Sequence, residues 1–158
     1  MPALFIGHGH PMNALWDNAF TQRLTALNEQ LDKPNAILVI SAHWLTRGAF
    51  VSSTNKPETI YDFGNFDEQL FKINYPAPGA PEYAKLVKET ISTAIELDDA
   101  MGLDHGTWSI LKYIFPKADV PVFQLSIDIT KSPQWHYALA VEIVSFTNFA
   151  YSGAPGAG

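Results

Sequence analysis

Short apolar runs that alternate with segments of helical period limit what this chain can fold into. Residues 36–40 read AILVI, a run typical of a strand that is buried on both faces of a sheet. In residues 18–31 the apolar side chains recur at spacings of 4, 3 and 4, which places them on one helix face: Phe20, Leu24, Leu27 and Leu31. A helix and a strand in this order indicate an α/β domain.

The same two periodicities predict the other elements. Apolar runs predict further strands at residues 3–6, 49–53 and 120–127. Helical spacing and proline positions predict helices at residues 81–94, 107–115 and 133–144. We expect the strands at 3–6 and 36–40 to form a parallel pair, because the helix between them allows a right-handed crossover.

Two stretches lack a sustained periodicity. Residues 47–79 are rich in proline, glycine and aromatic side chains, which predicts a long shaped loop. Residues 147–158 end in small and turn-forming types, and we expect them to form a frayed tail. Since no linker or repeat divides the chain, residues 1–158 are predicted to form a single domain.

The charge balance and the apolar pattern exclude several partners. With 10 Lys plus Arg against 16 Asp plus Glu, the net charge is −6, which argues against nucleic acid as a partner. No apolar run approaches the roughly 20 residues that a membrane span needs. The N-terminus also lacks the basic lead and cleavage site of a signal peptide, so we expect a cytoplasmic protein with no membrane partner.

The chain has no cysteine and five histidines, so a metal would be held by imidazole or carboxylate. His8 comes shortly after the predicted strand at 3–6, and His43 follows the strand at 36–40 in the same way. Side chains at the carboxyl ends of neighbouring parallel strands converge on one crevice. Gly7 and Gly9 beside His8 allow the backbone to approach a ligand closely. These two histidines are therefore candidate ligands of a divalent metal.

His105 lies at the predicted start of a helix, where the dipole favours a neutral imidazole that can exchange protons near neutral pH. His136, inside a predicted helix, is interpreted as structural. His10 could replace His8 as a metal ligand, although contact with a substrate is the preferred interpretation. Asp128 follows the last predicted strand and points towards the same crevice, although a capping role is an equally good interpretation.

Six motifs in this order carry a resemblance to a known family: GHGHPM, VISAHW, TIYDFGNF, YPAPG, DHGTWSIL and VPVFQLSID. Together they resemble the 4,5-DOPA extradiol dioxygenase family within the LigB-like class III extradiol ring-cleaving dioxygenases. The resemblance covers residues 1–140. It implies a three-layer αβα sandwich with a mixed, largely parallel central sheet.

The resemblance also implies a site and a chemistry. His8 and His43 are implied as ligands of Zn²⁺ or Fe²⁺, and His105 as the catalytic residue that transfers a proton. Ring cleavage with O₂ suits Fe²⁺, because zinc supplies no redox step. The substrate would be a small catechol such as DOPA, with substrate contacts from four residues: His10, Trp44, Asp62 and Phe63.

Two departures from the family keep other interpretations open. The family has a serine where this chain has His10, and its further metal-binding histidines lie in a C-terminal part that this chain does not match. We therefore expect a catalytic-type domain truncated relative to the family. The alternatives are a noncatalytic metal-binding or interaction module, and a zinc-dependent hydrolase that uses Asp62 or Asp128. A homodimer could cover the surface that the absent part would bury.

Overall fold

The computed structural model describes the backbone of residues 2–152 and the side chains of residues 2–145. Four strands form one sheet in the order β1, β4, β2, β3. Their bounds are β1 Ile37–Thr46, β2 Phe50–Ser52, β3 Glu96–Asp98 and β4 Val122–Asp128. The sheet is mixed but largely parallel, because β1 pairs with β4 and β2 with β3 in parallel, while β2 meets β4 antiparallel.

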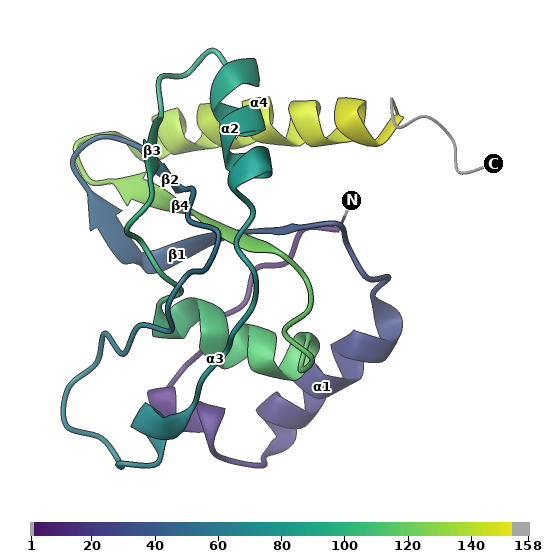
Figure 1. The fold of residues 1–158 in the computed structure, drawn as a ribbon, viewed down its shortest axis with the longest axis vertical. Coiled ribbons are helices and arrows are strands. Elements are labelled where there is room, and N and C mark those ends of the chain that lie inside the picture. Colours follow the sequence, from purple (N-terminus) through teal and green to yellow (C-terminus); the bar gives the residue numbers. More distant parts are fainter. Residues whose placement is uncertain (1, 153–158) are drawn as a thin grey trace.

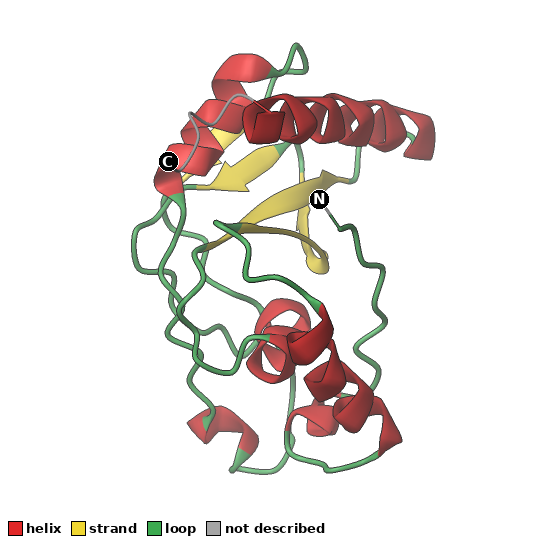
Figure 2. Cartoon of the chain, turned by 90° about the vertical axis from the view of Figure 1, so that its right-hand side faces the viewer, coloured by secondary structure: helices red, strands yellow, loops and turns green. Residues whose placement is uncertain are grey.

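Within residues 2–152, four α-helices and two short 3-10 helices accompany the sheet. The α-helices are α1 Ala19–Gln30, α2 Pro81–Thr90, α3 His105–Ile114 and α4 Pro133–Ser152. The 3-10 helices are η1 Pro11–Ala14 and η2 Leu70–Lys72. In Figures 1 and 2, α2 and α4 lie on one side of the sheet and α1 and α3 on the other. The expected αβα sandwich is confirmed.

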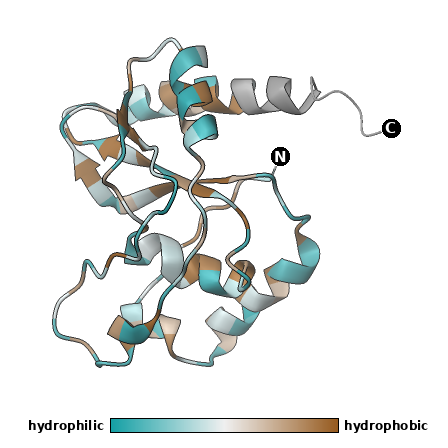
Figure 3. Cartoon of the chain, in the orientation of Figure 1, coloured by the Kyte–Doolittle hydropathy of each residue, from teal (hydrophilic) through white to brown (hydrophobic). Residues whose placement is uncertain are grey.

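The core follows the alternation of side chains along the strands. Phe123 and Leu125 of β4 face α2 and α4, where they pack with Leu139 and other buried side chains. Val122 of the same strand faces the opposite layer and packs with Trp108 of α3. Figure 3 shows the middle strands largely in the brown of apolar residues, while much of α1 and α2 is teal.

The prediction of a strand at residues 3–6 is wrong. This segment has no regular structure, and Phe5 is fully exposed. It is too short and too sparsely packed to hold a ladder of hydrogen bonds, although Ile6 packs against the cluster between α1 and α3. The parallel partner of β1 is consequently β4 and not the N-terminal run.

Strand β1 is longer than predicted and irregular. Its pairing with β4 shifts register between Ile40 and Leu45. His43 therefore lies inside the strand, in its unpaired middle, and does not follow the strand's end as predicted. Strand β3 was not predicted, because Glu96 and Asp98 are poor strand formers and only three residues pair.

Helix α1 agrees with its prediction, since Asn18 caps it and accepts backbone N–H bonds from Phe20 and Thr21. Helix α2 ends at Thr90, earlier than predicted, and the next turn is held by the Glu142 carboxylate, which accepts the backbone N–H groups of Ser92 and Thr93.

Helix α4 continues to Ser152, beyond the predicted end at residue 144 and into the segment predicted to fray. No proline or glycine interrupts residues 134–152, so nothing stops the helix there. The rest of the predicted tail, residues 153–158, lies outside the described residues. Within residues 2–152, no helix has both the length and the apolar character needed to cross a membrane.

Candidate metal centre

Three histidines from separate parts of the chain meet beside the irregular part of β1. His8 comes from the N-terminal segment, His43 from β1 and His105 from the first position of α3. Each offers a ring nitrogen, and these nitrogens lie within 4.8 Å of one another. The His43 and His105 ring centroids are 4.1 Å apart, and that of His8 lies 5.0 Å from each. The structure thus brings together the three histidines singled out from the sequence.

A polar relay holds His8 in place. The Asn13 side chain donates to the His8 carbonyl at 3.1 Å and accepts from the Asn18 side chain at 3.0 Å. Because Asn18 is the N-cap of α1, the start of that helix is coupled to the loop that carries His8. Gly9, which follows His8 in this loop, has φ +66°, a left-handed conformation that favours glycine.

His43 is positioned by a close approach of α3 to β1. A Cβ on Gly106 would lie 2.9 Å from His43 Cδ2, so only glycine fits this helix turn without displacement. The Ser41 hydroxyl donates to Asp104 Oδ1 at 2.8 Å, and Ser41 Oγ accepts the His43 backbone N–H at 3.2 Å. Asp104 also caps α3 by accepting the Thr107 N–H. One buried carboxylate therefore links the middle of β1 to the start of α3.

Asp62, in the long loop, contacts His105 twice. Its Oδ1 accepts the His105 backbone N–H at 2.8 Å and lies 2.9 Å from His105 Nδ1. Burial acts to raise the pKa of Asp62, but the hydrogen bonds from the His105 ring and backbone outweigh it, so the pKa lies below its usual value. Asp62 is therefore ionised at neutral pH.

The environment of His8 keeps its imidazole neutral. Burial lowers the pKa of His8, and the neighbouring His105 and His43 lower it further because a second positive charge is unfavourable there. Its Nε2 lies 2.8 Å from His43 Nε2, while its Nδ1 is buried without a hydrogen-bond partner among the described residues. A neutral imidazole is the form that binds a metal.

Aromatic side chains line one side of the cluster. The Phe63 ring meets the His105 ring edge to face, with centroids 5.4 Å apart and an interplanar angle of 88°. His10 stacks on Trp16 at 5.4 Å and meets the edge of Phe66, and its Nδ1 accepts the Met12 N–H as the cap of η1. His10 thus has a local structural partner on each side.

The remaining candidates are buried or hydrogen-bonded to their own segments. Trp44 is 8% exposed and therefore presents little surface to a ligand. Asp128 Oδ1 accepts from the backbone and hydroxyl of Thr130, which is the capping interpretation. His136 lies on α4, where its Nδ1 is 2.9 Å from the Ser132 carbonyl oxygen.

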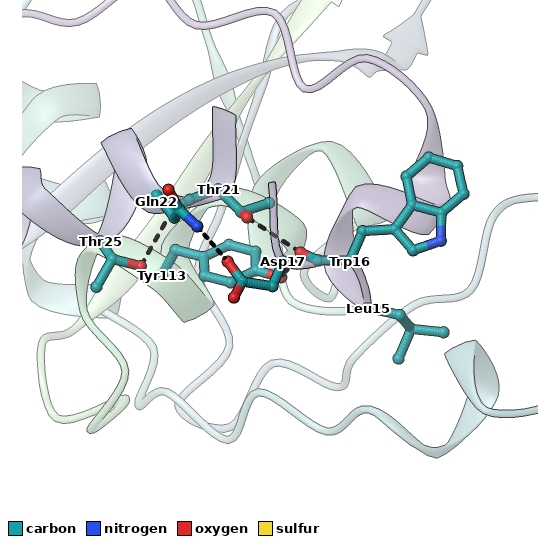
Figure 4. Close-up of a pocket in the computed structure, with 7 residues that line it drawn as sticks. All are labelled: Leu15, Trp16, Asp17, Thr21, Gln22, Thr25 and Tyr113. Atoms are coloured by element: carbon teal, nitrogen blue, oxygen red, sulfur yellow. Dashed lines mark hydrogen bonds between the residues drawn. The ribbon is translucent and has the colours of Figure 1, made fainter. Parts of the chain in front are cut away.

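Two hollows of the surface are lined by residues other than the three histidines. One of about 450 Å³ lies between α1, the preceding loop and α3 (Figure 4), and is lined by Leu15, Trp16, Asp17, Thr21, Gln22, Thr25 and Tyr113. Another of about 430 Å³ lies near Asp128 and Trp135. The candidate metal centre is thus identified by the convergent nitrogen atoms of its three histidines and not by a cavity.

Sequence reasoning missed three residues of the site: Ser41, Asp104 and Gly106. Asp104 had a local signal, because an aspartate directly before a predicted helix is a good N-cap. Ser41 and Gly106 act through contacts between β1 and α3, which are far apart in the sequence. Spacing along the chain carries no signal for such contacts.

The αβα sandwich (Figure 1) and the cluster of three imidazoles beside its sheet place this chain in the class of α/β proteins with a candidate metal centre. The chain belongs to the LigB family, since the model described as the catalytic LigB subunit of aromatic ring-opening dioxygenase matches residues 2–151.

Curated relatives and a solved structure agree with this membership. The chain is 45% identical over 147 residues to a 4,5-DOPA dioxygenase extradiol of Escherichia coli strain K12, covering 92% of this chain and 54% of that one. It is 39% identical over 142 residues to a 4,5-DOPA dioxygenase extradiol of Beta vulgaris, covering 85% and 53%. A crystal structure of an uncharacterized Escherichia coli K12 protein superposes with a TM-score of 0.66 and 37% identity, covering 82% of this chain and 48% of that one. The chain spans about half the length of the curated relatives it matches.

Proposed function

We propose that this chain binds a divalent metal and cleaves the ring of a small catechol, such as DOPA, with O₂. The observation that carries the proposal is the convergence of three imidazoles, from three separate segments, within 4.8 Å. Membership of the LigB family and the similarity to extradiol dioxygenases support the type of reaction. Both findings bear on the class of reaction, and the choice of DOPA as substrate is part of the proposal.

The donors fit a metal. Imidazole is a good ligand for both Zn²⁺ and Fe²⁺, and the depressed pKa of His8 favours its neutral, metal-binding form. His8 and His43 would hold the ion in this proposal. A bound Fe²⁺ would supply the one-electron chemistry with O₂ that ring opening needs, whereas Zn²⁺ would not.

His105 is proposed to transfer the proton of the catechol. Its ring packs beside those of His8 and His43, and its side chain is only 5% exposed, so bulk water has little access to it. Phe63 is proposed to provide an aromatic wall for the substrate ring, since it already packs against His105. His10 and Trp44 stay predictions as substrate contacts.

Oxygen uptake by the Fe²⁺-loaded chain tests the proposal. Anaerobically loaded protein is mixed with L-DOPA or protocatechuate, and oxygen consumption and a yellow ring-opened product are followed together. The matched controls are His43→Ala, which removes a proposed ligand, and His136→Ala, which removes a histidine outside the cluster. We expect turnover in the wild type and in His136→Ala, and its loss in His43→Ala. Full metal loading without oxygen uptake on any catechol would contradict the proposal.

A noncatalytic metal-binding module is the second candidate. The observation in its favour is that the chain spans only 54% of the Escherichia coli dioxygenase and 53% of the Beta vulgaris one. Stoichiometric metal without oxygen uptake would support it. Oxygen-independent hydrolysis of an ester or phosphate by the Zn²⁺-loaded chain would instead support a hydrolase, with Asp62 as the carboxylate beside the histidines.

A further inference from the structure

Asp62 contacts the His105 ring through one carboxylate oxygen. Oδ1 lies 2.9 Å from Nδ1 and also accepts the His105 backbone N–H at 2.8 Å. An ionised carboxylate can only accept hydrogen bonds, so the proton between the two groups belongs to Nδ1. In a neutral imidazole this leaves Nε2 with a lone pair and without a proton.

We propose that Asp62 is a positioning residue that fixes His105 in the Nδ1–H tautomer and keeps its Nε2 ready to accept a proton. The use of Nε2 in catalysis rests on the proposed function, whereas the tautomer is a property of the protein alone. Asp62 would then act through His105 and not as a direct contact to the substrate.

The loop that carries Asp62 is tied to the region around α3. The Ile60 N–H donates to the Leu103 carbonyl at 2.8 Å, and the Leu103 N–H donates to the Glu58 carbonyl at 2.7 Å. The indole N–H of the buried Trp108 donates to the Ile60 carbonyl at 2.8 Å. These bonds flank Asp62 on its N-terminal side and bring it to the first turn of α3, where a negative charge is also favoured by the helix dipole.

Competing partners for the two groups are few. The His105 side chain is 5% exposed, so water has limited access to Nδ1. Asp62 Oδ2 lies 3.9 Å from His43 Nδ1, which is too long for a hydrogen bond. Within the described part of the chain, the carboxylate is therefore committed to His105, and His105 Nδ1 has no other hydrogen-bond partner.

The direct test is the tautomer of His105 in the metal-free wild type, read by long-range ¹H–¹⁵N NMR of the ring nitrogens. Spectra are recorded at increasing pH, and the tautomer is read where the ring nitrogen shifts no longer change with pH. We expect a protonated Nδ1 and an unprotonated Nε2. A predominant Nε2–H form in the wild type would overturn the proposal.

Two variants and a matched control separate positioning from general support of the fold. In Asp62→Ala the Nε2–H form should become the major one, because a histidine side chain in water prefers it. Asp62→Asn, a weaker acceptor, should give a mixture. The control is Asp104→Asn, which weakens the cap of the same helix without touching the His105 ring. It should leave the tautomer unchanged. Equal tautomer shifts in Asp104→Asn and Asp62→Asn would overturn the proposal.

Turnover distinguishes failure of this inference from failure of the proposed function. In the Fe²⁺-loaded enzyme, Asp62→Asn should lower kcat by up to about 10⁴-fold, the effect of a catalytic histidine held in the wrong tautomer, with metal content unchanged. A wild type that shows the Nδ1–H form but no oxygen uptake would sink the proposed function and leave the positioning role intact. A wild type that turns over with an Nε2–H His105 would overturn the positioning role of Asp62 and leave the proposed function intact.

Discussion

Replacing Gly106 with alanine puts a methyl group into the contact between α3 and β1. Its Cβ would lie 2.9 Å from His43 Cδ2, 3.0 Å from Ser41 Oγ and 3.1 Å from Asp104 Oδ1. Carbon atoms pack best at about 3.5–4.0 Å, so the helix and strand must separate by about half an ångström. Such overpacking costs about 1–3 kcal/mol, and the higher helix propensity of alanine offsets at most about 1 kcal/mol. We expect Gly106→Ala to lower the free energy of unfolding by about 1–2 kcal/mol.

Thermal unfolding and zinc titration check this expectation. In a domain of this size, 1 kcal/mol corresponds to a Tm change of about 2–4 °C, so Tm should fall by about 2–8 °C. Zinc affinity should fall as well, because the added methyl displaces His43. Gly7→Ala is the matched control, since a Cβ there meets nothing within 4 Å. Wild-type Tm and zinc affinity in Gly106→Ala would refute the close approach.

Three further variants probe other parts of the account. His105→Gln should lower turnover by about 10²–10⁴-fold with metal content retained; metal loss in elemental analysis would instead make His105 a ligand. Glu142→Gln should lower stability at neutral pH by about 1 kcal/mol after screening by solvent, as measured by urea unfolding. Hydrogen bonds from Thr93 and then Ser92 lower the pKa of Glu142. The stability that its carboxylate contributes is therefore present above the unfolded pKa and is lost as pH falls through the folded pKa. A stability difference between wild type and Glu142→Gln that persists at acid pH would contradict this prediction. Asn18→Ala should cost about 1 kcal/mol through the lost cap and also weaken zinc binding, because the relay to His8 is broken; unchanged zinc affinity would exclude the relay.

The sequence predicted the elements whose signals are local. Helix α1 begins at its Asn18 cap, and the apolar run at residues 36–40 supplies the first part of β1. The predicted burial on both faces is wrong, because β1 is an edge strand and Ile40 is 53% exposed. The prediction of a strand at residues 3–6 was wrong, because a short apolar run becomes a strand only when a neighbouring strand completes its hydrogen bonds. Strand β3 was missed for the converse reason, since pairing with β2 overrides its weak propensity.

The candidate site shows the same division. The sequence singled out His8, His43 and His105, whose residue type and position near predicted strand or helix ends carry a chemical signal. It gave no sign that Asp62 binds His105, because 43 positions separate the two residues and Asp62 lies in the stretch at 47–79 that lacks a sustained periodicity. The contact of Gly106 with His43 was equally hidden, since it depends on how closely a helix approaches a strand.

Metal stoichiometry tests the central claim, that His8 and His43 form a metal centre in this chain. Metal-free protein is titrated with Zn²⁺ by calorimetry, and bound metal is then counted by elemental analysis in the wild type, His8→Ala, His43→Ala and His136→Ala. The account predicts one ion per chain in the wild type and in His136→Ala, and none held at stoichiometric zinc in the other two variants. Stoichiometric binding that survives both His8→Ala and His43→Ala, or a wild type that binds no metal, would contradict it.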